Sequence, residues 1–250
     1  MARRATVIKA TRKSAPNVLL LDAGNALWSR QQPAEETKGK VVIEAMKLLS
    51  YDAMALGDLD LQLGVEALSQ RIAEAGFPVL SANLALAGSG KLLAKPYALL
   101  NVGGRKVGVI GLTWDKALVP PGLETQLKVL SADEALEKYV RELTGKTDII
   151  VVLSTMGEQE DQRLSSLVSG IDLIAGGRTR VPQDQAWKND ETGTLIVQAG
   201  SQGEWLGRRS LHFDPTGVVT EHKDELIYLT EDFVDDPELK AFMERNKPLQ

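Results

Sequence analysis

Short apolar runs alternating with helix-type segments constrain the fold of this chain more than any other feature. Such runs, followed by glycine, aspartate, asparagine or serine, are typical of buried strands that end in loops. Because strands and helices alternate, the pattern predicts an α/β domain built in layers. The runs expected to form buried strands are Val18–Leu21, Ala53–Leu56, Pro78–Ala82, Asp148–Leu153 and Ile171–Ala175.

The segments between these runs carry signals for helices and for antiparallel strands. Gly103-Gly104 separates Tyr97–Val102 from Lys106–Leu112, which predicts a hairpin. Late in the chain, Thr194–Gln198 and Trp205–Phe213 are expected to be antiparallel strands. No internal repeat or linker interrupts the pattern, so we expect one domain over residues 1–250. The expected helices are Ala5–Arg12, Val41–Leu49, Gly64–Ala75, Ala132–Leu143, a polar helix containing Asp161–Leu167, and Pro237–Glu244.

Composition excludes several classes of function. The 250 residues include no cysteine, so disulfides, thiolate zinc sites and cysteine nucleophiles are excluded within them. Only two histidines occur, which removes most histidine-based metal chemistry. The formal net charge is -5, whereas a nucleic-acid-binding chain typically carries a strongly basic surface, so no nucleic acid is expected as a partner. No apolar run reaches the roughly 20 residues of a membrane span, and none is expected.

Three local motifs are weak. Gly88-Ser89-Gly90-Lys91 resembles part of a phosphate-binding loop, but Leu92 stands where a serine or threonine should hold magnesium. Ala199–Gly203 resembles a nucleophile elbow, but a strand pattern follows where that motif needs a helix. Both are better explained as turns. His212, in a strand-like run, and His222, in a charged loop, are expected to be structural or solvated.

The loops that follow the predicted strands are more informative. The carboxyl ends of strands in such sheets converge on one crevice, where ligands usually bind. Four loops with polar side chains could build a single site there. These loops are Asp22–Asn25, Gly57–Asp60, Ser154–Gly157 and Gly176–Arg180.

Several blocks resemble the metallophosphatase domain of the 5′-nucleotidase/UDP-sugar hydrolase family, among the calcineurin-like phosphoesterases. Asn17–Asn25 (NVLLLDAGN) is similar to the family's LLDAGD block, and Tyr51–Gly64 (YDAMALGDLDLQLG) to its YDA-x-x-x-GNHEFD-x-G block. Gly170–Arg180 (GIDLIAGGRTR) and Gln198–Gly207 (QAGSQGEWLG) follow in order. The resemblance covers nearly the whole chain and implies a four-layer α/β/β/α sandwich.

The family's chemistry uses two divalent metals, and this chain departs from the ligand pattern. Asn25 stands where the bridging aspartate belongs, and Asp58 where a ligand asparagine belongs. Leu59 replaces the catalytic histidine, and Gln62 replaces its carboxylate partner. The resemblance therefore implies no catalytic residue at these positions.

The remaining ligand histidines are also replaced, by Thr155, Arg178 and Arg180. A guanidinium cannot donate a lone pair to a metal, so we expect no metal cofactor. Arg178 and Arg180 are instead candidates to bind an anion through bidentate hydrogen bonds. Alternatively, they pair internally with Asp58 or Asp60, or lie on a bare surface.

Relative to the family, both ends of the domain are affected. The family's opening strand, with its Asp-x-His, would lie upstream of Met1, and its C-terminal nucleotide-binding domain would follow residues 234–250, where the interdomain helix begins. In this late start the chain resembles the UshA-like (seleno)protein branch, whose members carry redox residues upstream. An upstream signal would make the protein periplasmic, whereas a start at Met1 as written implies a cytoplasmic protein.

These observations predict a degenerate domain without metal-dependent hydrolysis, retained as a binding or structural module. Its expected partners are a small anion or nucleotide, or another protein. The alternatives are a residual phosphoesterase and a redox protein whose active residues lie upstream of Met1. Metal content distinguishes the binding or structural module from a residual phosphoesterase. An upstream cysteine or selenocysteine would favour the redox protein.

Overall fold

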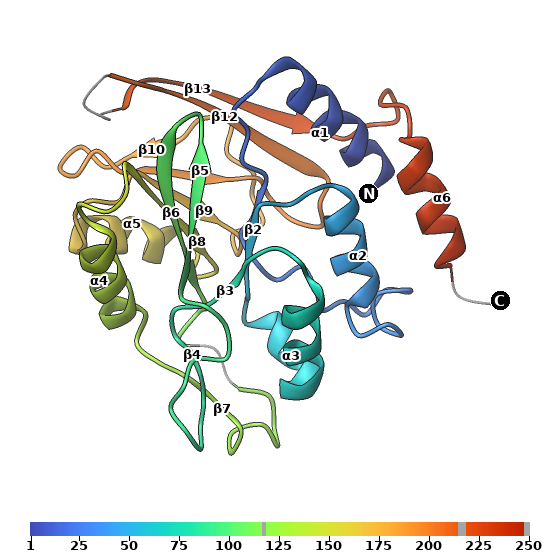
Figure 1. The fold of residues 1–250 in the computed structure, drawn as a ribbon, viewed down its shortest axis with the longest axis horizontal. Helices are drawn as coiled ribbons and strands as arrows, with labels where there is room; N and C mark the ends of the chain where they lie inside the picture. Colours follow the sequence, from blue (N-terminus) through green and yellow to red (C-terminus); the bar gives the residue numbers. More distant parts are fainter. Residues whose placement is uncertain (117–118, 215–218, 248–250) are drawn as a thin grey trace.

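The computed structural model describes residues 1–116, 119–214 and 219–247, which form four layers (Figure 1). A three-stranded sheet and a six-stranded sheet face each other across an apolar interior. Helices cover the outer face of each sheet. The expected α/β/β/α sandwich is therefore confirmed.

The first sheet is small and parallel. Its strands are β1 (Leu21–Asp22), β2 (Ala53–Ala55) and β3 (Val79–Leu80), in that order. Every residue of β2 and β3 is buried, because one face meets the second sheet and the other meets helices. The covering helices are α1 (Ala2–Ser14), α2 (Lys40–Leu48), α3 (Gly64–Glu74) and α6 (Pro237–Arg245).

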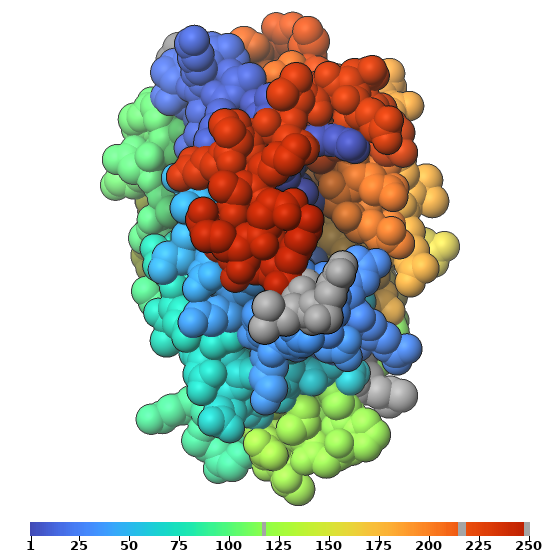
Figure 2. Space-filling model, turned by 90° about the vertical axis from the view of Figure 1, so that its right-hand side faces the viewer, coloured from blue at the N-terminus to red at the C-terminus, as the bar shows by residue number. Residues whose placement is uncertain are grey.

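Helices from the two ends of the chain pack together. The Asp236 carboxylate accepts a hydrogen bond from the Leu239 N–H at 3.0 Å and so caps the start of α6. The same side chain pairs with Lys9 of α1 at 2.7 Å. In Figure 2 the red C-terminal segment lies against the blue N-terminal one. This helix pair closes the outer layer over the first sheet.

The second sheet has parallel strands at its centre and antiparallel strands at its edges. Its order is β10-β11-β9-β8-β6-β5, where β6, β8, β9 and β11 run parallel. The strands are β5 (Tyr97–Val102), β6 (Arg105–Leu112), β8 (Ile149–Ser154), β9 (Leu173–Gly176), β10 (Trp187–Lys188) and β11 (Leu195–Gln198).

Two helices, α4 (Ala132–Leu143) and α5 (Glu158–Leu167), cover the outer face of the second sheet. The hydroxyl of Ser131 accepts a hydrogen bond from the Glu134 N–H and caps α4. The apolar residues at helical spacing along α4 face the sheet, as the sequence pattern predicted.

Two antiparallel pairs complete the described structure. β4 (Leu84–Leu86) pairs with β7 (Leu127–Val129), and β12 (Trp205–Phe213) pairs with β13 (Val219–Tyr228). Leu206 packs against the helix-side core of the first sheet, whereas Phe213 packs against the core between the two sheets. β12 therefore lies in the layer of the first sheet, although among the described strands it pairs only with β13.

Three predictions were wrong in detail. β11 pairs antiparallel with β10, as predicted, but it also runs parallel to β9 because it extends the parallel centre of the second sheet. His222 lies in β13 and not in a loop, since its strand pairs with β12 along one largely exposed face. The expected strand Val18–Leu21 forms a ladder only at Leu21–Asp22. The hairpin at Gly103-Gly104 is confirmed, with positive φ at both glycines.

Within the described residues, no helix combines the length and apolarity that crossing a bilayer requires.

Candidate functional site

The loops at the carboxyl ends of β1, β2, β8 and β9 come together in one crevice. This crevice forms part of a large cavity of about 1530 Å³. Close packing of the loops depends on Gly177, where a Cβ would lie 2.6 Å from the backbone oxygen of Ala23. The residues of interest that line the cavity are Asn25, Asp58, Leu59, Arg178 and Arg180.

An ion pair occupies the centre of the crevice. Nη1 of Arg178 lies 2.7 Å from Oδ2 of Asp58, and the Asp58 side chain is only 10% exposed. Asn25 supports the same carboxylate by donating from Nδ2 to Oδ1 of Asp58 at 3.2 Å. Of the two acidic partners considered for the arginines, the structure thus pairs Arg178 with Asp58.

Trp114 holds Arg178 from its other side. The guanidinium carbon of Arg178 lies 3.6 Å from the centre of the Trp114 ring, a close cation–π contact. Trp114 follows β6, so the end of a further strand contributes to the crevice. The sequence interpretation missed Trp114, although its place directly after an apolar run was the signal that identified the other loops.

Asp60 fixes the loops beneath this ion pair. The carboxylate is fully buried and accepts hydrogen bonds from the backbone N–H groups of Asn25, Leu27, Trp28 and Gly57. Burial raises the pKa of Asp60 to about 6, although these donors oppose the shift. Because its oxygens are used by the backbone, Asp60 acts as a brace for the loops and forms no ion pair with Arg178.

Asn25 sits in a strained position that the neighbouring loop accommodates. Its φ of 60° lies in the left-handed region, which asparagine tolerates better than most residues. Oδ1 of Asn25 accepts a hydrogen bond from the Leu59 N–H at 2.8 Å. A Cβ at Gly57 would lie 2.0 Å from that Oδ1, so only glycine fits there. The side chain of Asn25 therefore holds the loops after β1 and β2 together directly.

The remaining predicted positions are not all inside the crevice. Thr155 is buried, and its hydroxyl bonds the backbone of Leu112 and Trp114. Leu59 is 43% exposed, and Gln62 is exposed on the surface of a short 3-10 helix. Arg180 is exposed at the rim and, within the described parts of the chain, forms no ion pair.

The residues present do not fit a pair of divalent metal ions. Arg178 places a cation against Asp58, and a guanidinium has no lone pair for a metal. Thr155 spends its hydroxyl on backbone groups. Residues 1–116, 119–214 and 219–247 contain no cluster of three or more histidine, aspartate or glutamate side chains placed to hold a metal.

A second buried carboxylate, Asp161, was also missed by the sequence interpretation. Oδ1 of Asp161 accepts a hydrogen bond from Ser154 at 2.5 Å, whereas Oδ2 is buried without a partner in the described structure. Both polar side-chain atoms of Gln198 are likewise buried and unpartnered there. Burial raises the pKa of Asp161 to about 7. No sequence pattern indicated this cluster.

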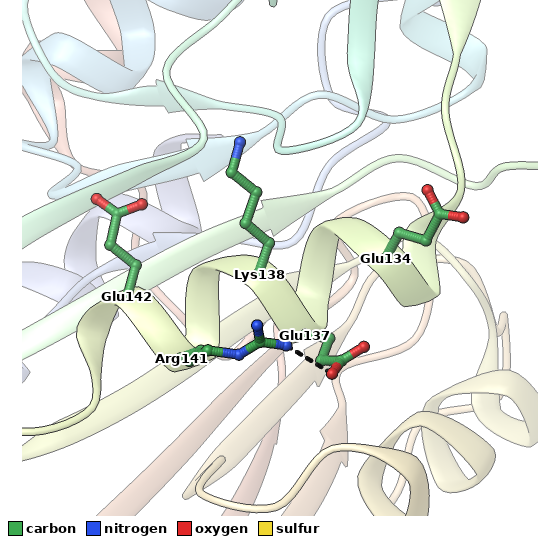
Figure 3. Close-up of a pocket in the computed structure, with 5 residues that line it drawn as sticks. All are labelled: Glu134, Glu137, Lys138, Arg141 and Glu142. Carbon is green, nitrogen blue, oxygen red and sulfur yellow. Dashed lines mark hydrogen bonds and ion pairs between the residues drawn. The ribbon is translucent and has the colours of Figure 1, made fainter.

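The weak motifs do not form sites. Gly88–Lys91 makes a turn in which the Gly90 N–H donates to Leu86 and the Leu86 N–H donates to Lys91. Ala199–Gly203 joins β11 to β12, so no helix follows it. His212 lies in β12. A shallow hollow of about 420 Å³ on α4 is lined by surface charges, including the ion pair Arg141–Glu137 at 2.6 Å (Figure 3). None of these features adds chemistry to the crevice.

Comparison with known proteins supports the family that the sequence resembled, although no family model matches the chain. Snake venom 5′-nucleotidase from Naja atra is 33% identical over 275 aligned positions, which cover 99% of this chain and 51% of that protein. The crystal structure of a 5′-nucleotidase precursor from Thermus thermophilus superposes with a TM-score of 0.89 and 31% identity, over 98% of this chain and 52% of that one.

A third comparison supports the fold alone. Calcineurin-like phosphoesterase YfkN from Bacillus subtilis superposes with a TM-score of 0.81 at 23% identity, over 98% of this chain and 87% of that one. The chain spans about half the length of the curated relatives that it matches. Its fold and its sequence nevertheless match these 5′-nucleotidases along nearly all of its own length, so this chain is similar to that part of the 5′-nucleotidase family.

Proposed function

We propose that this chain is a degenerate nucleotidase-type domain that does not catalyse metal-dependent hydrolysis and serves as a binding or structural module. The contact between Arg178 and Asp58 at 2.7 Å carries the proposal. It places a permanent cation on the Asp58 carboxylate, and stacking on Trp114 holds that cation in position. An internal ion pair thereby replaces the counter-charge that metals would supply.

The binding role rests on Arg180. Its guanidinium lines the same cavity as Arg178 but, within the described residues, has no acidic partner. An uncompensated arginine at the rim of a crevice favours a small anion, such as a phosphate or the phosphate group of a nucleotide. Arg178 contributes less, because Asp58 already neutralises it.

Metal analysis and hydrolysis assays test the loss of activity. We expect protein purified from manganese- and zinc-supplemented medium to contain no stoichiometric metal. It should not hydrolyse AMP or bis-p-nitrophenyl phosphate with added Mn²⁺, Zn²⁺ or Fe²⁺. Two tightly bound metal ions per chain, together with hydrolysis, would support the residual phosphoesterase and overturn the proposal.

Thermal unfolding with added anions tests the binding role. Phosphate, sulfate and AMP are titrated, and a ligand at 100 times its Kd should add about 2.7 kcal/mol of stability. Arg180→Gln should remove this gain, whereas Arg141→Gln, on the exposed face of α4, is the matched control and should retain it. No gain with any anion would contradict anion binding and leave a structural module.

A further inference from the structure

Strand β5 forms one edge of the second sheet, and its open side lacks the usual protection against pairing. Among the described strands it pairs only with β6, and its six residues include no charge and no proline. Leu99, near its middle, is 58% exposed. At the opposite edge, β10 has only two residues and ends in Lys188. Short edge strands and lysines discourage pairing with another chain, and β5 has neither.

Alternate residues of β5 supply the backbone groups of the open edge. The Gly111 N–H of β6 donates to the backbone oxygen of Pro96 at 3.2 Å, directly before β5 begins. In an antiparallel ladder, every second residue directs both its N–H and its C=O to the same neighbouring strand. The even-numbered residues of β5 therefore face β6. The open edge is left with the backbone groups of Tyr97, Leu99 and Asn101.

Charges of opposite sign lie at the two ends of β5. At one end, the Tyr97 hydroxyl donates to Oε1 of Glu142 in α4 at 2.6 Å. At the other end, Asn101 is opposite Lys106 in the β5–β6 ladder, so their side chains share one face. Lys106 is exposed and, within the described residues, its side chain has no acidic partner. The neighbouring carboxylate of Asp148 accepts the backbone N–H of Lys106 instead.

We infer that β5 is a docking edge for a second copy of this chain, related to the first by a twofold axis near Leu99. Antiparallel pairing of the two β5 strands places Leu99 beside its counterpart and Tyr97 opposite the partner's Asn101. The backbone groups of the open edge then pair with those of the other copy. The two six-stranded sheets become one continuous sheet.

The arrangement of charges makes this edge complementary to itself. Because the paired strands run antiparallel, Glu142 comes to the end of the partner's β5 where the partner's Lys106 lies. The twofold axis produces this contact twice. A second copy thus supplies backbone partners, apolar cover for Leu99 and an opposite charge together. The inference does not depend on the proposed function, because β5 and α4 contribute no residue to the ion pair of the crevice.

Charge reversal, followed by sedimentation velocity over a range of concentrations, tests this arrangement. Glu142→Lys and Lys106→Glu each place like charges at both contacts of the dimer, whereas an equimolar mixture of the two variants restores opposite charges at both. Glu137→Lys is the matched control, because Glu137 projects from a different side of α4 than Glu142 (Figure 3).

Leu99→Pro tests the backbone pairing separately. Its N–H points to the open side, so proline removes a donor from the dimer contact and leaves the ladder with β6 intact. Thermal unfolding confirms that each variant is folded. Amide hydrogen exchange of Tyr97, Leu99 and Asn101 is followed in the unaltered chain at low and high protein concentration.

We expect the unaltered chain to dimerise reversibly, with slower exchange at these three amides as the dimer forms. Each charge reversal should raise the dimer Kd by roughly tenfold or more, because it creates two like-charge contacts. The mixture should recover the affinity as a heterodimer, Leu99→Pro should abolish dimerisation, and Glu137→Lys should leave the Kd unchanged.

Three results would overturn the inference. The first is a chain that remains monomeric at every concentration, since the edge then takes no second copy. The second is a dimer that Leu99→Pro and both charge reversals leave intact, which would place the interface elsewhere. The third is a mixture that dimerises no better than either reversed variant alone, because Glu142 and Lys106 would then not meet across the twofold axis.

Discussion

Two buried carboxylates at the carboxyl ends of the two sheets differ in whether the chain supplies their partners. Four backbone N–H groups surround Asp60 in the crevice. Asp161, close to Gly176 and Gln198, has one oxygen bonded to Ser154 and one without a partner in the described structure. The chain thus supplies partners for both oxygens of Asp60, whereas among the described residues it leaves one oxygen of Asp161 without a partner.

This difference shows how neighbouring groups of the fold compensate a buried carboxylate. A single side chain, Arg178, supplies the charge that Asp58 needs, because one substitution can place a cation beside a carboxylate. No neighbouring side chain among the described residues does the same for the second oxygen of Asp161. The predictions below test this contrast, beginning with the largest expected effect.

Removal of the Asp60 carboxylate should cause the largest loss of stability. Asp60→Ala leaves four N–H groups without an acceptor, two of them in buried bonds and two in partly buried ones, and should lower the free energy of unfolding by about 4 kcal/mol. Asp60→Asn keeps one oxygen and should lose about half as much. Urea unfolding measures both, with exposed Asp190→Ala as the control. A loss below about 1 kcal/mol for Asp60→Ala would contradict the bracing role.

Leucines in the two edge strands of the first sheet should respond differently to truncation. Leu80 of β3 is fully buried, and Leu80→Ala should lower the free energy of unfolding by about 3 kcal/mol. Leu21 of β1 is half-buried and borders the cavity, so Leu21→Ala should lower it by about 1 kcal/mol. Equal losses in urea unfolding would mean that Leu21 is packed in solution as fully as Leu80.

Loss of the crevice ion pair should have an intermediate effect. Arg178→Ala leaves Asp58 largely buried without its cation and removes the stacking on Trp114, so unfolding free energy should fall by about 2 kcal/mol. Arg180→Ala should change it by less than about 0.5 kcal/mol, because this side chain is exposed. If the two variants lost equal stability, Arg178 would not be the internal counter-charge.

Asp161 should make stability depend on pH. Its folded pKa of about 7 lies above its ordinary value of 3.8, so the folded state holds a proton that the unfolded state releases. The stabilising contribution is therefore complete below about pH 4 and is lost as the pH rises to 7. Asp161→Asn should remove this dependence and raise the free energy of unfolding by about 1 kcal/mol at about pH 8, where it removes a buried negative charge. The gain is small because the asparagine amide still needs hydrogen-bond partners. An unchanged pH profile in chemical unfolding would contradict this assignment.

The sequence predicted the layers well and the contacts poorly. Apolar runs and their following loops identified the strands that build the crevice, because burial on both faces requires continuous apolar residues. β13 was missed since its residues are mostly polar, and it is a strand only because β12 pairs with it. Whether Arg178 would meet Asp58 or Asp60 depended on backbone hydrogen bonds to Asp60, which no spacing of residues reveals.

The cavity that contains the crevice also makes the stability of the molecule sensitive to hydrostatic pressure. Pressure favours whichever state has the smaller volume, and unfolding eliminates the internal voids of a folded protein. The cavity of about 1530 Å³ has no equivalent in the unfolded chain. Pressure should therefore destabilise the described structure, and unfolding should begin around β1 and β12, which line this cavity, rather than at the buried carboxylate of Asp60.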